Sequence, residues 1–178
     1  MAEAFSNKVT RAAGIVSTSS AGAVGILTNL ITGISTVDVA VNDLVDNSQF
    51  LTGTKVSSVG ASQVVCDRDS TNTSSVTSQS VKFLGPTTAY TSTGTKSILV
   101  GGTFANNTTN SVNLTVQVFD NSASSEVGIA AKIPVPSGSS FVITDAGKTV
   151  LESSDEIRVY CDSANAIDAT LSILTGVS

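Results

Sequence analysis

Hydrophobic and polar residues alternate with a period of two along the second half of the chain. In residues 112–119, VNLTVQVF, every second side chain is Val or Leu, the pattern of a β-strand with one buried face. Six further runs have strand character: residues 97–106, 127–136, 139–145, 148–153, 156–162 and 168–174. Seven short strands joined by turns predict an all-β fold, an antiparallel β-sandwich of the jelly-roll or Ig-like type. No segment repeats its apolar residues at helical spacing.

The same alternation predicts which side chains face the core of the sandwich. In residues 97–106 the expected inward set is Ile98, Val100, Gly102 and Phe104. In residues 156–162 it is every second residue from Ile157, and in residues 168–174 every second residue from Ala169. These positions are our candidate core.

The first half of the chain is less regular. Its strand-like runs are residues 25–32, 37–41, 55–60, 63–68 and 80–85. Ala61 and Ser62, which follow Gly60, predict a tight hairpin between two of these runs. Pro86 marks the clearest break, because proline donates no ladder hydrogen bond and restricts the residue before it. We therefore expect an outer sandwich, residues 13–22 and 87–178, interrupted by a small inserted β-module, residues 23–86.

Residues 1–12, MAEAFSNKVTRA, are expected to form an N-terminal arm. The arm has one large apolar side chain, Phe5, and two cations, Lys8 and Arg11, in a chain whose net charge is −5. Such an arm can lie across a neighbouring subunit, burying Phe5 and pairing Lys8 and Arg11 with acids of that subunit. The alternative is that the arm packs on the sandwich of its own chain. Phe5, Lys8 and Arg11 are the candidate partner-binding residues, and a homo-oligomer is expected.

Composition narrows the possible functions. The 178 residues include no histidine, which excludes Ser-His-Asp and Cys-His catalysis and His-ligated metals. The nine Lys and Arg are scattered through an acidic chain, so binding to nucleic acid is not expected. Mean hydropathy is +0.27, but no apolar run is long enough for a membrane span or has the form of a signal peptide. We expect neither an enzyme nor a cofactor, and no membrane partner.

One motif matches a phosphate-binding loop in part. Gly147, Lys148 and Thr149 have the sequence of its end, but Val142 stands where the motif needs glycine. A strand-like run also follows, where the motif needs a helix. A turn at residues 145–147 between two strands is the better interpretation.

Asp67 and Asp69 have the spacing of the first ligands of a calcium loop. The sixth position of that motif is Asn72 instead of glycine, and the twelfth is Ser78 instead of glutamate. An EF-hand is therefore excluded. The open alternatives are a weak surface calcium site at Asp67 and Asp69 and a solvated loop without a metal.

The remaining reactive side chains are expected to be structural. Four further acids are candidates for acid–base chemistry: Asp43, Asp46, Asp155 and Glu156. They stand in turn-like stretches without aromatic neighbours, so we expect solvated turn residues. Cys66 and Cys161 lie in strand-like runs and are expected to be buried free thiols; a disulfide between them is the alternative.

The strand and turn sequences also carry a resemblance. The opening MAEAFSNKVTRAAG, the stretch TKSILVGGTFANNTTNSVNLTVQVFD and the later run from IPVPSGSS to DATLSIL resemble small virion structural proteins of tailed phages that infect cyanobacteria. The resemblance covers the outer sandwich. The inserted residues, with TGTKVSSVGASQVV, look like a small β-repeat module of phage and other surface proteins.

The resemblance implies a structural protein located in the virion. Its partners are then other virion proteins, either the major capsid protein or proteins of the neck or tail. Decoration of the capsid shell is the favoured role, and attachment at the neck or tail is the first alternative. A receptor- or glycan-binding module is the second alternative, against which stands the scarcity of Trp, Tyr and His.

Overall fold

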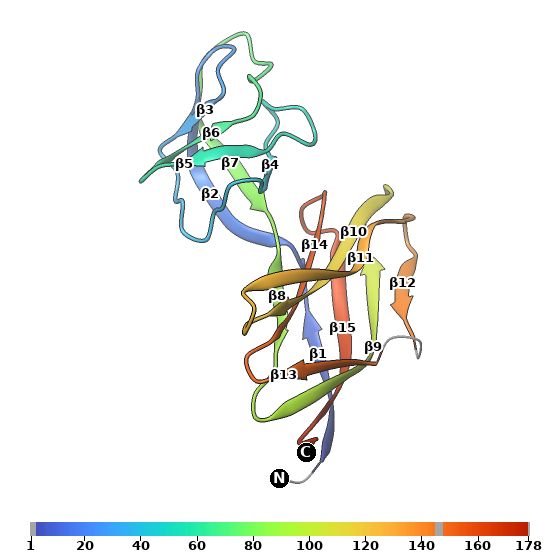
Figure 1. Ribbon diagram of the computed structural model, residues 1–178. Coiled ribbons are helices and arrows are strands. Elements are labelled where there is room, and N and C mark those ends of the chain that lie inside the picture. Colours follow the sequence, from blue (N-terminus) through green and yellow to red (C-terminus); the bar gives the residue numbers. More distant parts are fainter. Residues whose placement is uncertain (1–2, 145–147, 178) are drawn as a thin grey trace. The chain divides into compact units, whose positions relative to one another are not determined.

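The computed structural model describes residues 3–144 and 148–177, and these residues form strands and no helix (Figure 1). The strands pair antiparallel in three sheets, which confirms the predicted all-β, sandwich-type fold. The chain divides into two compact units. Unit 1 holds the described residues of Met1–Gly14, Pro86–Cys161 and Asn165–Ser178. Unit 2 holds Ile15–Gly85 and Asp162–Ala164.

Unit 1 is built from two sheets around one core. The first sheet has the order β1-β15-β9-β12, with β13 also paired to β9. Its strands are β1 (Ala4–Thr10), β9 (Lys96–Asn106), β12 (Ser140–Ile143), β13 (Thr149–Glu152) and β15 (Ile167–Thr175). The second sheet has the order β11-β10-β14-β8. Its strands are β8 (Thr87–Thr91), β10 (Val112–Asp120), β11 (Ser125–Val135) and β14 (Glu156–Cys161).

The core of unit 1 follows the predicted alternation in most strands. Every second residue from Ile157 and from Ala169 is buried, as expected. The prediction for residues 97–106 is right only in part. In β9 Leu99 is buried instead of Ile98 and Val100, while Gly102 and Phe104 face the core as predicted. The cause is a β-bulge: Leu99 lies opposite Ile173 and Gly101 opposite Ser172, so one residue of β9 has no partner and the alternation shifts by one.

Unit 2 contains one six-stranded sheet with the order β4-β7-β2-β3-β6-β5. Its strands are β2 (Ile15–Val24), β3 (Leu30–Thr32), β4 (Leu44–Asp46), β5 (Val56–Val59), β6 (Gln63–Cys66) and β7 (Val76–Leu84). The predicted hairpin is confirmed, because β5 pairs with β6 and the N–H of Gly60 donates to the carbonyl of Gln63 at 2.8 Å. Unit 2 has its own core, in which Phe83 and Ile31 are fully buried.

The strand predicted at residues 37–41 is wrong. These residues form turns, in which Val39 is buried while the neighbouring valines are exposed. Asp38 has a φ of 63° and Asn42 a φ of 77°, in the left-handed region that interrupts a strand. The carboxylate of Asp43 accepts a hydrogen bond from the N–H of Ala40 at 2.8 Å, which closes one of these turns.

One expected boundary changes. The sequence predicts that residues 13–22 belong to the outer sandwich, but Ile15–Val24 is strand β2, which pairs with β7 in unit 2. Within the predicted arm, residues 1–12, Ala4–Thr10 is strand β1, which pairs with β15 of the same chain, as the alternative of an arm packed on its own sandwich predicts. Gly14 is the last residue of the N-terminal segment that belongs to unit 1. Its φ is 101°, and a Cβ there would lie 2.9 Å from the Cα of Tyr160, so glycine is required at this position.

Neither cysteine forms a disulfide, and both are buried, as predicted. They lie in different cores, Cys66 in that of unit 2 and Cys161 in that of unit 1. Burial raises the pKa of the Cys66 thiol to about 12, and the charge of Asp67 adds to this effect. The Cys66 thiol is therefore protonated at neutral pH and acts as a small apolar side chain.

Candidate interaction surface

The acids at residues 155 and 156 are not solvated turn residues, contrary to expectation. Asp155 is buried, and its two carboxylate oxygens accept hydrogen bonds from the N–H groups of Asn121 at 3.0 Å and Glu152 at 2.9 Å. The carboxylate thereby joins the turn after β10 to the turn between β13 and β14. The carboxylate supplies the acceptor for both of these partly buried N–H groups. Asp155 has a structural role.

Removal of this carboxylate has a measurable cost. Asp155→Ala is expected to lower the free energy of unfolding of unit 1 by about 1.5–3 kcal/mol, because the hydrogen bonds to a charged acceptor are lost and two N–H groups lose their partner. Chemical denaturation measures the change. Glu3→Gln, at an exposed acid of the same unit, is the control and is expected to change the free energy by roughly half a kcal/mol or less. Equal effects of the two substitutions would contradict the assigned role.

Asp43 is also buried, in unit 2. Burial raises the pKa of its carboxyl, and the hydrogen bond from Ala40 opposes that rise. Asp67 uses one carboxylate oxygen to accept the N–H of Lys55 at 2.9 Å and to pair with Arg68 at 3.4 Å. The hydrogen bond from Lys55 is the largest cause of the lowered pKa of Asp67. These contacts tie down the local loops.

Metal-ligating side chains do not come together within residues 3–144 and 148–177. No cluster of three or more Asp, Glu or Cys side chains that could hold a metal occurs among these residues. Thr149 begins strand β13 where a phosphate-binding loop needs a helix. The turn predicted at residues 145–147 lies outside the described residues.

Arg158 is the centre of a charged cluster on the four-stranded sheet. Its guanidinium pairs with Glu156 at 2.8 Å and Glu126 at 3.0 Å, and it lies 3.8 Å from the centre of the Phe119 ring. Glu156 also accepts the hydroxyl of Thr88 at 2.8 Å. The cluster crosses all four strands of this sheet, because its members belong to β8, β10, β11 and β14. Its charges are satisfied within the chain, so it stabilises the sheet.

The outer face of the five-stranded sheet is different, because apolar side chains are exposed on it. Two rows of directly opposed residues cross the strands. The Phe5 row consists of Phe5, Leu174, Ile98 and Val150. The Val9 row consists of Val9, Thr170, Thr103 and Val142. Asn7, Ser172 and Gly101 lie between the two rows.

These rows have no charged member and leave much apolar surface open to solvent. The exposed fraction is 63% for Phe5, 72% for Val9, 54% for Val150 and 48% for Val142. Contiguous exposed apolar surface on a sheet marks an interaction site more often than scattered apolar residues do. We call these two rows, with the residues between them, the apolar face.

Of the three predicted partner-binding residues, the structure places only Phe5 on the apolar face. Lys8 lies opposite Leu171, a core residue, and therefore points to the other side of the sheet. Arg11 follows the end of β1 and is exposed. The three do not converge on one site. The sequence does not predict the other members of the apolar face. Alternation shows that a strand has two different faces, but it does not show which face is left open to solvent.

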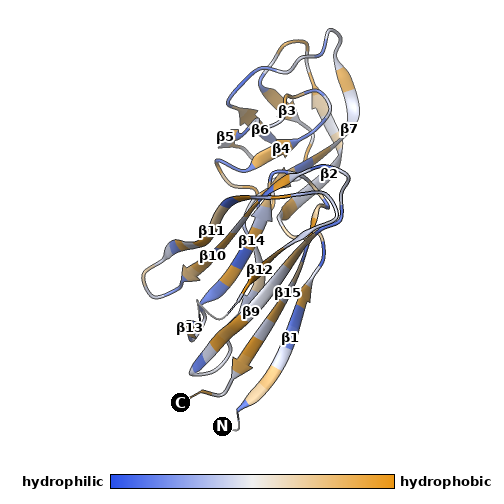
Figure 2. Ribbon diagram, turned by 90° about the vertical axis from the view of Figure 1, so that its right-hand side faces the viewer, coloured by the Kyte–Doolittle hydropathy of each residue, from blue (hydrophilic) through white to orange (hydrophobic). Residues whose placement is uncertain are grey.

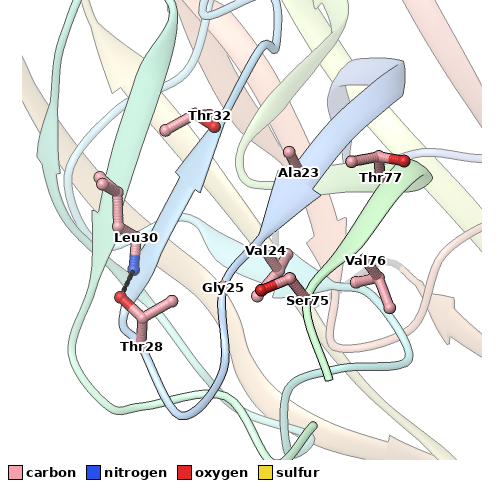
Figure 3. A pocket seen from close by; sticks show the side chains of 9 residues that line it. All are labelled: Ala23, Val24, Gly25, Thr28, Leu30, Thr32, Ser75, Val76 and Thr77. Carbon is pink, nitrogen blue, oxygen red and sulfur yellow. Dashed lines mark hydrogen bonds between the residues drawn. The ribbon is translucent and has the colours of Figure 1, made fainter. Parts of the chain in front are cut away.

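Unit 2 carries a groove of about 320 Å³ on its sheet (Figure 3). Nine residues line it: Ala23, Val24, Gly25, Thr28, Leu30, Thr32, Ser75, Val76 and Thr77. The hydroxyl of Thr28 accepts the N–H of Leu30 at 3.3 Å, so it is already used inside the chain. The lining has no aromatic and no charged side chain, the groups that stack on sugars or fix charged ligands.

Comparison with family models, with curated proteins and with solved structures finds no match to this chain. Within the described residues, no helix is long and apolar enough to cross a membrane.

Proposed function

We propose that this chain is a non-enzymatic structural component of a tailed-phage virion that decorates or stabilises the capsid shell. The observation that carries the proposal is the apolar face, whose two rows contain no charged residue and whose Phe5 and Val9 side chains are more than half exposed. A broad, flat surface of this kind suits attachment to another protein and does not enclose a small substrate. The occupant that we assign to it is the major capsid protein.

Two further observations support a structural role. The stretches that resemble cyanophage virion proteins lie, apart from Asp162–Ala164, in unit 1, the unit that carries the apolar face. The buried acids and the Arg158 cluster are each used in hydrogen bonds or ion pairs within the chain. Attachment at the neck or tail remains the alternative within the same class, and a glycan-binding module is disfavoured because the groove of unit 2 lacks aromatic side chains.

Purified particles test the location. Quantitative mass spectrometry of virions is expected to find hundreds of copies of this chain per particle if it decorates the shell. About a dozen copies would place it at the neck or tail. Its absence from purified particles would overturn the proposal.

A substitution on the apolar face tests the attachment surface. Val150→Asp places a charge in the Phe5 row, so binding of the purified chain to particles is expected to weaken at least about tenfold, which corresponds to roughly 1.4 kcal/mol. Val127→Asp is the matched control: Val127 is also exposed, but it belongs to β11 of the other sheet. Equal binding by the two variants, both folded by circular dichroism, would contradict attachment through this face.

A further inference from the structure

Strand β1 is an unusually open edge. β15 pairs with one side of β1 through all seven residues without a register shift, and no described strand pairs with the other side. Figure 2 shows β1 at the border of its sheet, with β15 and then β9 following on one side. Strand β1 contains neither proline nor glycine. The unpaired N–H and C=O groups of such an edge can pair with another strand.

The other sheet edges among the described residues are each short or irregular. The opposite edge of the same sheet is divided between β12 and β13, with four residues each. In the four-stranded sheet, β11 contains Pro134 and two register shifts against β10, and β8 has only five residues. The edges of the unit 2 sheet, β4 and β5, have three and four residues. Natural sheets protect their edges by these devices, and β1 lacks most of them.

We propose that β1 pairs antiparallel with β1 of a second copy of this chain, around a two-fold axis that passes through Asn7. Residues that lie opposite each other in a sheet project to the same face of it. Two residues of β1 project to the same face only when an even number of positions separates them, so the axis must pass through a residue and not between two residues. Asn7 is the midpoint of Ala4–Thr10, and an axis there pairs all seven residues. Phe5 then lies opposite Val9 of the second copy, and Val9 opposite Phe5 of that copy. Aromatic and β-branched side chains form favourable cross-strand pairs.

Lys8 selects this register over its neighbours. Lys8 projects to the inner side of the sheet, where a charge on an edge strand discourages wrong pairing. An axis at Lys8 would place the two Lys8 side chains directly opposite each other. An axis at Ser6 would place Phe5 opposite Asn7 and leave Val9 without a partner. With the axis at Asn7, Lys8 lies opposite Ser6 of the second copy, and no like charges are opposed.

The proposed register also joins the apolar faces of the two copies. The Phe5 row of one copy ends at Phe5, and the Val9 row of the other copy begins at Val9, directly opposite it. The two rows become one line of eight opposed positions across the combined sheet. Phe5 and Val9, which are exposed in one copy, are the side chains that the second copy contacts directly in this arrangement. The self-complementarity of the edge identifies a second copy as its occupant. This inference is independent of a role in the virion.

Cysteine cross-linking of the full chain tests the register. Asn7→Cys puts two thiols opposite each other at the axis, so mild oxidation is expected to give a disulfide-linked dimer. Phe5→Cys alone is the matched control and is expected not to cross-link, because its counterpart lies opposite residue 9. Phe5→Cys combined with Val9→Cys is expected to cross-link again. The natural cysteines are buried in both units and do not compete. Equal cross-linking of Phe5→Cys and Asn7→Cys would overturn the register.

Sedimentation or light scattering tests the association itself, without any new disulfide. The unmodified chain is expected to show a concentration-dependent monomer–dimer equilibrium. Asn7→Lys opposes two like charges at the axis and is expected to weaken dimerisation at least tenfold. Thr103→Lys, exposed on the same face but on β9, is expected to leave dimerisation unchanged. A chain that is monomeric at every concentration, or a dimer unaffected by Asn7→Lys, would overturn the proposal, whatever the outcome of particle binding.

Discussion

Phe104→Ala is expected to lower the free energy of unfolding of unit 1 by about 3–5 kcal/mol. Phe104 is fully buried on β9, and its ring centre lies 6.3 Å from that of Phe141. A Cβ added at Gly102 would lie 3.2 Å from the Phe104 ring, so the surrounding backbone is fitted closely to this side chain. Truncation removes the buried ring and leaves a cavity that the paired strands cannot fill by collapsing.

The composition of the chain allows the two units to be followed separately. The chain has no Trp and two Tyr, Tyr90 and Tyr160, both in unit 1. Tyrosine fluorescence therefore reports the unfolding of unit 1. Unit 2 has Cys66, whose thiol is buried and has a pKa raised to about 12, so it reacts with alkylating reagents only after unit 2 opens. Labelling at Cys66, read by peptide mass, reports unit 2.

Phe83→Ala is the matched control for Phe104→Ala. Phe83 is a fully buried phenylalanine in the core of unit 2. We expect Phe104→Ala to shift the tyrosine transition and leave Cys66 labelling unchanged, and Phe83→Ala to do the reverse, because their cores are separate clusters. A single transition that both substitutions shift equally would show that the two units unfold as one.

The class of fold could be predicted from the sequence because alternation is a local property. In β14 and β15 every second residue is apolar and is buried, so the alternation seen in the sequence matches the burial pattern of these strands. The bulge in β9 could not be predicted, since it depends on the pairing of Leu99 and Gly101 with residues of β15. Residues 37–41 alternate as a strand does, but Asp38 and Asn42 adopt left-handed conformations that end it.

The roles of Asp155 and of the apolar face were harder to predict than the fold, because these roles depend on which side chains are buried and which are exposed. Asp155 follows a serine-rich turn and has the sequence context of a solvated acid, yet it accepts the N–H of nearby Glu152 and that of Asn121, which is distant in the sequence. Phe5 was identified as a candidate from its isolation in a polar segment. Val150 and Val142 were not, since an exposed valine and a buried valine look alike in an alternating strand. Only the sheet order shows which face is open.

The second large expected effect concerns deletion of unit 2. Replacing residues 15–85 with a short Gly-Ser linker is expected to leave a folded unit 1. The N–H of Gly14 donates to the hydroxyl of Thr87 at 2.8 Å, so the two ends to be joined already lie side by side. The deletion removes β2 to β7 and the whole core of unit 2, and it leaves both sheets of unit 1 complete.

A second deletion tests where the junction between unit 1 and unit 2 lies. Deletion of residues 23–86, the boundary expected from the sequence, retains Ile15–Gly22, the greater part of β2 without its partner β7. That unpaired segment exposes strand edges and apolar side chains, so we expect aggregation. Deletion of residues 15–85 is expected to preserve a cooperative tyrosine transition close to that of the full chain. If this shorter chain also aggregates, unit 1 needs unit 2 to fold, and the insertion is part of one cooperative structure.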